Sequence, residues 1–100
     1  MVRFIKVTGD SLYPAFRQGD FVLISKIPFL LNKLKVGDVI VFEQPIYGVM
    51  IKRIAEVIPG GQEFTVLGTD EFSVDSRQFG PVSRETLLGK VVWHVRRPMS

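Results

Sequence analysis

Hydrophobic residues in this chain occur in short runs that glycine, proline and aspartate interrupt. The runs are rich in branched and aromatic side chains, and none keeps a helical period over about ten residues. Strand-like runs bounded by turn-forming residues are typical of an all-β sandwich or barrel. We therefore predict a mostly β fold, a small barrel or sandwich with at most short helical turns. Strands are expected at Phe4–Val7, Asp20–Ser25, Val39–Phe42, Val49–Ile58, Glu63–Leu67 and Gly89–Arg96.

Four segments carry more specific expectations. Asp20–Ser25 is so rich in branched and aromatic residues that we expect it to be buried on both faces. Arg84–Thr86 is expected to form a short turn before the last strand. Ser73–Gly80 is polar and rich in turn-forming residues, which predicts a loop. Ile27–Leu34 is expected to be a connection, although it is unusually apolar for one.

Length and composition limit the number of domains and the kinds of catalytic or metal site that the chain can form. A chain of 100 residues with 46% hydrophobic residues is expected to form one domain, residues 1–100. It contains no cysteine, which excludes disulfides, thiolate metal sites and a cysteine nucleophile. The one histidine, His94, lies in an alternating run and is expected to be a strand residue, not a ligand or a base. We therefore expect neither a metal site nor a cofactor.

The charge pattern bears on possible partners. The net charge is +3, but the basic residues are scattered apart from Arg96 and Arg97, and no nucleic-acid motif is visible. We do not expect a nucleic-acid partner. No apolar run approaches the roughly 18–20 residues that span a bilayer. The sequence therefore predicts a protein that is cytoplasmic or peripheral to a membrane.

A serine with turn-forming neighbours stands near the start of the chain, in the segment Gly-Asp-Ser-Leu-Tyr-Pro at residues 9–14. A serine hydroxyl is a weak nucleophile unless a neighbouring base takes its proton during attack. With no cysteine and with His94 expected elsewhere, the base for Ser11 would be a lysine or a carboxylate. A serine in such a turn is, however, usually only a turn residue.

Lys52 is the candidate base, because it stands in an otherwise apolar run. A lysine acts as a base only when neutral, and its ordinary pKa of about 10.4 leaves about one molecule in 2,500 neutral at pH 7. Burial among apolar residues favours the neutral form. Strand alternation separates Lys52 from Arg53, which points to the opposite face. Periodicity by itself favours a simpler alternative, in which Lys52 lies on the solvent face of an amphipathic strand.

Four segments resemble, in the same order, the conserved boxes of type I signal peptidases, the Ser/Lys peptidases of family S26. Residues 9–20 resemble their Ser-Met-x-Pro-Thr-Leu…Gly-Asp box, and residues 35–42 their Gly-Asp-(Val/Ile)-Val-Val-Phe strand. Residues 51–54 resemble the lysine box, and residues 73–82 the Ser-x-Asp-Ser-Arg-x-Phe-Gly box. The serine and lysine boxes also occur in self-cleaving repressor domains, whereas the last box does not.

The resemblance implies catalytic roles for three side chains. Ser11 would be the nucleophile that forms an acyl-enzyme, and its backbone N–H would donate to the oxyanion. Lys52 would be the general base, and Ser73 would orient it by a hydrogen bond. The resemblance also implies that the last box supports this arrangement, with an Asp75–Arg77 salt bridge holding the loop and Ser76 beside it.

The resemblance further implies an extended protein substrate that carries an N-terminal leader. The substrate would pair with the strand before Lys52 and the segment before Ser11, with small residues one and three positions before the cut. Its contacts would come from Thr8, Gly9, Asp10, Met50 and Ile51. A peripheral membrane contact would come from Ile27, Phe29, Leu30 and Leu31, unless this segment packs on the barrel instead.

The chain also departs from the family pattern. Leu12 and Ala15 replace the usual methionine and threonine, and Gly9 supplies no hydroxyl as a second oxyanion donor. Leu67–Phe72 lacks the usual Gly-Asp-Asn. Residues 79–82 and 89–93 look most like those of core-only, anchorless members, among them peptidases proposed to trim the leader of nickel-type superoxide dismutase. Two other readings stay open: a self-cleaving repressor-type domain, and a non-catalytic β domain that binds peptide or membrane.

Overall fold

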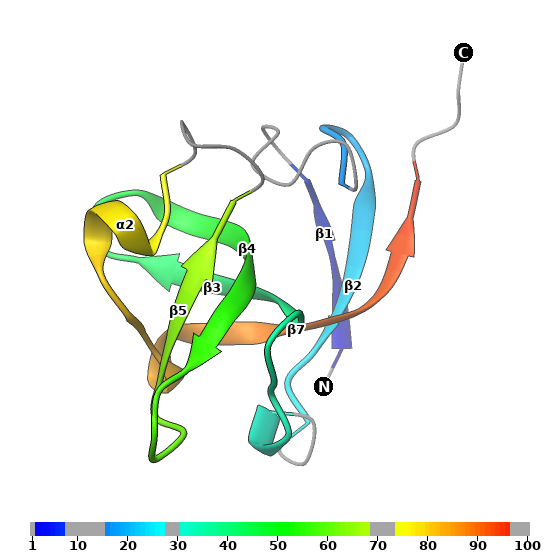
Figure 1. Ribbon diagram of the computed structural model, residues 1–100. Helices are drawn as coiled ribbons and strands as arrows, with labels where there is room; N and C mark the ends of the chain where they lie inside the picture. Colours follow the sequence, from blue (N-terminus) through cyan, green and yellow to red (C-terminus); the bar gives the residue numbers. More distant parts are fainter. Residues whose placement is uncertain (1, 8–15, 28–30, 69–73, 97–100) are drawn as a thin grey trace.

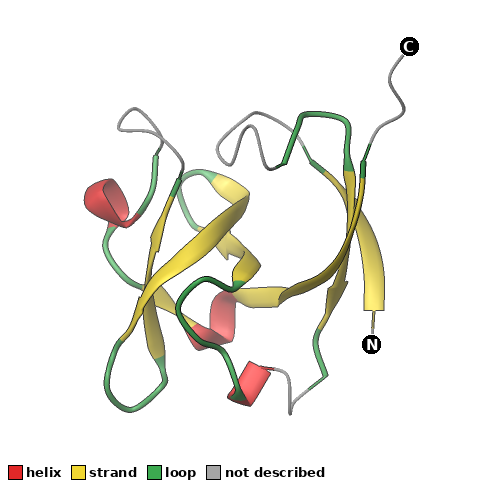
Figure 2. Cartoon of the chain, turned by 45° about the vertical axis from the view of Figure 1, so that its right-hand side comes forward, coloured by secondary structure: helices red, strands yellow, loops and turns green. Residues whose placement is uncertain are grey.

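The computed structural model describes residues 2–7, 16–27, 31–68 and 74–96 (Figure 1). Its strands form one antiparallel seven-stranded sheet, and helix occurs only as short turns between strands (Figure 2). The prediction of a mostly β fold with only short helical turns is confirmed. The strands are β1 (Val2–Lys6), β2 (Phe21–Ser25), β3 (Val39–Gln44), β4 (Gly48–Val57), β5 (Glu63–Leu67), β6 (Val82–Ser83) and β7 (Leu87–Val95). The short helical segments with complete bounds are α2 (Ser76–Phe79) and η1 (Arg84–Thr86).

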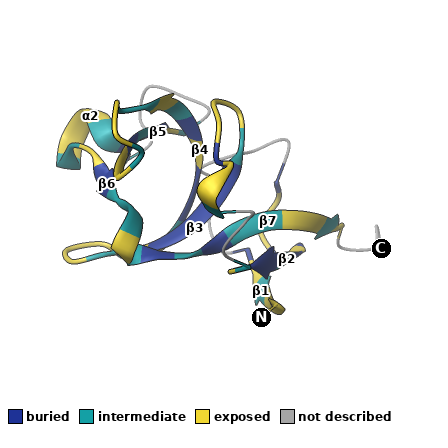
Figure 3. Ribbon diagram, turned by 90° about the horizontal axis from the view of Figure 1, so that it is seen from below, coloured by how far each residue is buried: buried dark blue, intermediate teal, exposed yellow. Residues whose placement is uncertain are grey.

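The sheet has the strand order β1-β2-β7-β3-β4-β5-β6, so the last long strand lies near its middle. In Figure 1, β7 runs beneath β3 and then turns upward beside β2, joining the two halves of the molecule. Seen from below, β3, β4, β5 and β6 curl around one another in a barrel-like half (Figure 3). β1, β2 and the end of β7 form the other half.

The central strand β3 is buried on both faces and supplies two hydrophobic cores. Val39 and Val41 belong to the first core, and Ile40 and Phe42, which point the opposite way, belong to the second. The first core consists of Val7, Phe16, Val22, Ile24, Val39, Val41 and Ile51. The second consists of Leu34, Ile40, Phe42, Ile54, Phe64, Val66, Val82 and Leu87. One unbroken apolar strand therefore holds both halves together.

Gly89 allows β7 to pass close to β2 where it changes from one half to the other. A Cβ at this position would lie 3.0 Å from the Ser25 carbonyl oxygen and 3.1 Å from the Ile24 Cβ. Both neighbours belong to a strand that is paired on each side, so neither moves easily. A side chain here would require these neighbours to shift by a few tenths of an ångström, so glycine suits this position.

Two local expectations need correction. β2 is not buried on both faces, because Phe21 at its start is 44% exposed and only the alternate face packs into the first core. Ser73–Gly80 is not a loop throughout, because Ser76–Phe79 forms the helical turn α2. Asp75 caps this turn, and the Gln78 side chain accepts a hydrogen bond from the Asp75 N–H, completing a capping box. The expected short turn at Arg84–Thr86 is confirmed as η1.

Candidate functional site

Lys52 lies inside the molecule, with 1% of its surface exposed. It stands in β4 opposite Ile40 of β3, and Ile54, two residues further along the same face, belongs to the second core. The alternative in which Lys52 occupies a solvent face is therefore wrong. Periodicity misjudged this strand because both of its faces carry apolar residues.

Arg53, the next residue, has the opposite environment. Its side chain is exposed, and its guanidinium donates a hydrogen bond to the Gly37 carbonyl oxygen at 2.9 Å. The predicted separation of the two basic residues by strand alternation is confirmed. One basic side chain is exposed to water, whereas the other lies among core residues.

Asp75 is fully buried, and both oxygens of its carboxylate accept hydrogen bonds. Oδ1 accepts from the Arg77 backbone N–H at 3.0 Å and from Arg77 Nε at 2.9 Å. Oδ2 accepts from Arg77 Nη2 at 2.8 Å and from the Gly68 N–H at 2.9 Å. Burial alone would raise the pKa of Asp75, but these hydrogen bonds and the Arg77 charge outweigh it and lower that pKa to about 2. The Asp75–Arg77 ion pair is therefore present at neutral pH.

We call Asp75, Ser76 and Arg77 the Asp75 box. Hydrogen bonds attach this box to β5, the strand that pairs with β4. Ser76 Oγ accepts a hydrogen bond from the Val66 N–H at 2.8 Å, and Asp75 holds the Gly68 N–H just beyond β5. β4 and β5 pair through Arg53 and Leu67, so one further step in this register brings Gly68 opposite Lys52. Through its hydrogen bonds to Val66 and Gly68, the Asp75 box is thus attached to the strand that pairs with β4 next to Lys52.

Several predicted site residues lie outside the described part of the chain: Ser11, Thr8, Gly9, Asp10 and Ser73. The structure does describe the residues on either side of residues 8–15. The Val7 N–H donates to the Asp20 carbonyl oxygen at 2.7 Å, and the Gly19 N–H donates to the Val7 carbonyl oxygen at 2.8 Å. These bonds join the chain before Ser11 to the chain after it, and we call the joined pair, Val7 and Phe16–Asp20, the stem.

The two predicted substrate-contact residues that are described, Met50 and Ile51, directly precede Lys52 in β4. Ile51 is buried in the first core opposite Val41, and Met50 is half-buried opposite Phe42 and packs against the second core. Their side chains therefore point to opposite faces of the sheet.

Sequence reasoning missed an interaction of His94. The prediction that His94 is a strand residue is confirmed, since it lies in β7 opposite Val22. Its Nε2 is also 2.7 Å from Oδ2 of the buried Asp20, and its ring stacks on Phe16 with centroids 4.4 Å apart. Asp20 precedes His94 by 74 residues, and no local pattern links the two.

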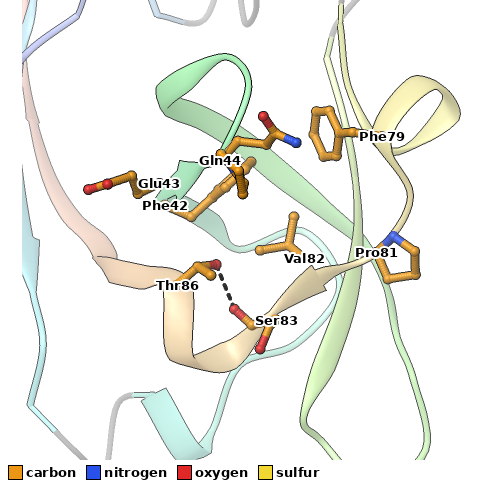
Figure 4. A pocket seen from close by; sticks show the side chains of 9 residues that line it. Phe42, Glu43, Gln44, Phe79, Pro81, Val82, Ser83 and Thr86 are labelled. Carbon is orange, nitrogen blue, oxygen red and sulfur yellow. Dashed lines mark hydrogen bonds between the residues drawn. The ribbon is translucent and has the colours of Figure 1, made fainter.

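A hollow of about 280 Å³ opens at the rim of the barrel-like half, between the end of β3 and β6 (Figure 4). Phe42 and Phe79 meet there edge to face, with ring centroids 6.1 Å apart. On the opposite side, the Thr86 hydroxyl donates to the Ser83 carbonyl oxygen at 2.7 Å. The hollow is lined by Phe42, Glu43, Gln44, Pro45, Phe79, Pro81, Val82, Ser83 and Thr86. None of these is a predicted site residue.

The apolar connection after β2 is described only at its ends, because Phe29 and Leu30 lie outside the described residues. Leu31 packs against the second core, and its carbonyl oxygen accepts a hydrogen bond from Arg84 Nη1 at 2.6 Å. For Leu31 this favours packing on the barrel. In the described part of the chain, no helix has the length and apolar character that crossing a bilayer requires.

Comparison with known proteins assigns the chain to a family. The family described as "Signal peptidase, peptidase S26" matches residues 1–62, which include Ser11 and Lys52. The Asp75 box lies beyond the matched residues. A search of curated proteins finds no match. With more than half of its length matched, the chain belongs to the peptidase S26 family of signal peptidases, and this membership implies a serine peptidase that acts on protein substrates.

Proposed function

We propose that this S26 peptidase is a Ser/Lys endopeptidase that removes an N-terminal signal or leader segment through an acyl-enzyme. Ser11 is the nucleophile and Lys52 the general base. The observation that carries the proposal is the burial of Lys52 among residues of the second core. A lysine is almost never buried to this extent unless its amine is paired.

Burial supplies the property that a lysine base needs. Neutrality at pH 7 requires the pKa of an ordinary lysine to fall by about three units, or about 4 kcal/mol. Transfer of an ammonium group into an apolar interior works in this direction, because it penalises the charged form. Ile40 and Ile54 are apolar neighbours of this kind on the sheet face that carries the Lys52 side chain.

The proposed reaction has two steps, acylation of Ser11 and hydrolysis of the resulting ester. Lys52 takes the proton of Ser11 as the serine oxygen attacks the scissile carbonyl carbon, and the Ser11 N–H stabilises the oxyanion. Collapse breaks the peptide bond, and the Lys52 ammonium returns its proton to the departing amine. Lys52 then takes a proton from water, whose oxygen attacks the ester. Collapse then breaks the ester bond, and the Lys52 ammonium returns its proton to the Ser11 oxygen. This regenerates Ser11 and neutral Lys52 and releases the leader with a carboxylic acid that ionises in water.

The Asp75 box acts as a support in this proposal. Ser73 orients the Lys52 amine, and the residues that follow it hold the connecting chain in place. The hydrogen bonds from Val66 and Gly68 to the box support this role, because they attach it to the end of β5 beside Lys52. Asp75 and Arg77 are in this view positioning residues.

The substrate would bind as an added strand along β4. In the described residues, pairing of β5 with β4 begins at Arg53, whereas Gly48–Met50 pair with β3 on their other side. This part of β4 precedes Lys52 and can receive an extended peptide. Met50 and Ile51 would contact the substrate here, and Thr8, Gly9 and Asp10 would contact it from the other side.

The finer subgroup rests on residues that have packing explanations. Phe79 contacts Phe42 edge to face, and Gly89 lets β7 lie close to β2. Their similarity to the peptidases of the nickel-type superoxide dismutase leader therefore carries little weight. We keep the proposal at the level of a leader or signal peptidase.

The proposal also includes a peripheral membrane contact, for which the half formed by β1, β2 and the end of β7 offers exposed aromatic residues in the described part of the chain. Phe4 and Trp93, 61% and 65% exposed, share one face of β1, β2 and β7, because both lie in the row of Leu23. Lys6 and Phe21 form the next row. Exposed aromatic residues beside a lysine suit the interface of an anionic bilayer.

A direct test uses an internally quenched peptide with alanine one and three positions before the cut. Ser11→Ala and Lys52→Met are each expected to abolish cleavage, with circular dichroism unchanged. Arg53→Met is the matched control, because it removes a neighbouring cation from the opposite face, and it should cleave normally. A folded Lys52→Met protein with normal activity would refute the mechanism. Loss of intact mass without any added peptide would instead favour self-cleavage, and no cleavage by the wild type would favour a non-catalytic binding domain.

A further inference from the structure

His94 and Asp20 form a pair that no step of the proposed reaction uses. His94 Nε2 lies 2.7 Å from Asp20 Oδ2, and the Asp20 side chain is almost completely buried. An ionised carboxylate can only accept hydrogen bonds, so with Asp20 ionised we assign Nε2 of His94 as the donor. A buried charge-assisted hydrogen bond of this length is among the stronger polar contacts in a protein. Such a contact is well suited to hold two segments in one fixed arrangement.

Asp20 is the residue on which the stem converges. Its carbonyl oxygen accepts from the Val7 N–H at 2.7 Å, so it holds the chain that enters residues 8–15. Its Oδ2 accepts from the Arg17 N–H at 3.0 Å, and its own N–H donates to the Arg17 carbonyl oxygen, so it also closes the turn after that segment. The ring of Phe16, the first described residue after the segment, stacks on His94.

We propose that His94, acting through Asp20 and Phe16, is a positioning residue that holds the stem of the segment bearing Ser11. The inference rests on the proposed function, since it matters to catalysis only if Ser11 is the nucleophile. β7 is suited to this role because it lies in the middle of the sheet, paired with β2 on one side and β3 on the other. Contacts with β7 thereby hold the stem in a fixed position relative to the sheet that carries Lys52.

The geometry separates this role from a catalytic one. In the proposed reaction Lys52 moves the protons, and His94 Nε2 is engaged by Asp20. A positioning residue can be replaced by a side chain that keeps the contact without titrating, whereas a general base cannot. Glutamine keeps an N–H donor at a similar distance from the backbone, and phenylalanine keeps the ring that stacks on Phe16 but removes the donor.

The experiment compares His94→Gln, His94→Phe and Val91→Ala on the quenched peptide, well below the unfolding midpoint of each variant. Val91 is the matched control, because it lies on the same strand and packs against the first core, to which Val7 and Phe16 also belong, but its side chain has no donor that could hold Asp20. We expect His94→Phe to lower kcat/KM about tenfold and His94→Gln to keep it within about threefold, in line with one charged hydrogen bond. Val91→Ala should lower the midpoint and leave kcat/KM unchanged. Asp20→Asn combined with His94→Phe should be no worse than the more damaging single change, because the two residues act as a unit.

A second readout does not depend on activity. The amide protons of Val7 and Gly19 are both hydrogen-bonded in the stem, so His94→Phe should speed their exchange with solvent and His94→Gln should not. Unchanged exchange and unchanged kcat/KM in His94→Phe would overturn the inference. So would an activity loss that Val91→Ala reproduces, or a loss as complete as that of Ser11→Ala without rescue by glutamine. If the wild type cleaves nothing but exchange responds as expected, the proposed function fails and the stem contact stands.

Discussion

The Gly68 N–H donates a hydrogen bond to the Asp75 carboxylate at 2.9 Å, and this contact attaches the capped turn α2 to the end of β5. The same carboxylate receives the Arg77 guanidinium through two of its nitrogens. A residue that caps a helical turn thus also joins two segments of chain beside Lys52. The integrity of this neighbourhood should therefore depend on the charge of Asp75.

Asp75→Asn should destabilise the protein while leaving its shape unchanged. The substitution removes the charge and replaces an acceptor with an amide donor among groups that are themselves donors. A pKa lowered from its ordinary 3.8 to about 2 corresponds to about 2 kcal/mol of stability, which the amide would forfeit. Urea unfolding at pH 7 measures the loss. Glu56→Gln, an exposed carboxylate in β4, is the control and should change stability by no more than about 0.5 kcal/mol.

The same carboxylate predicts how stability depends on pH. The folded-state pKa of Asp75 lies below its unfolded value, so its contribution is present above about pH 4 and is lost as the pH falls toward 2. The difference in unfolding midpoint between the wild type and Asp75→Asn should therefore shrink between pH 5 and about pH 2. A difference that stayed constant over this interval would show that Asp75 does not stabilise the fold through its charge.

Lys52→Met should give a folded protein at least as stable as the wild type. Methionine has a similar length and no charge, so it removes the cost of a buried amine without opening a cavity. Lys52→Ala should instead lose about 2 kcal/mol or more, because it leaves a void against Ile40 and Ile54. Thermal unfolding of the two variants distinguishes these outcomes. Strong destabilisation by methionine would indicate that the amine contributes to the fold.

Gly89→Ala should destabilise the sheet by about 1–3 kcal/mol, because the added methyl group meets the Ser25 carbonyl oxygen and Ile24 at short range. Val92→Ala, an exposed change on the same strand, should alter stability by no more than about 0.5 kcal/mol. Chemical denaturation compares them. Equal stability of Gly89→Ala and the wild type would mean that β7 can move away from β2 at this crossing.

Trp93, the one tryptophan, reports on the proposed membrane contact. Its fluorescence should shift to shorter wavelength with vesicles that contain phosphatidylserine and should shift less with purely zwitterionic vesicles. Phe4→Ser should weaken binding about tenfold, because one large apolar side chain no longer leaves water. Val36→Ser is the control, because it changes an exposed apolar residue in the turn before β3. An unshifted spectrum with both lipids would argue against this surface.

Much of the fold is local in origin and was predictable. The strands at Val39–Gln44 and Gly48–Val57 follow from continuous apolar runs between Gly, Pro and Asp turns, and their pairing follows from a short connection. The turn at Arg84–Thr86 was predicted for the same reason. The capping box of α2 was missed, although its Asp75…Gln78 spacing is a local signal that could have revealed it.

For the candidate site, the sequence by itself determined which residue types are available: one histidine, no cysteine, and a lysine inside an apolar run. Tertiary structure decided which face Lys52 occupies, because burial of a strand face depends on what packs against it and not on its own alternation. It also decided that Asp75 reaches Gly68 and that His94 reaches Asp20. These contacts arise only when β5 and β7 take their places in the sheet, and the strand order that brings them together is a property of the whole chain.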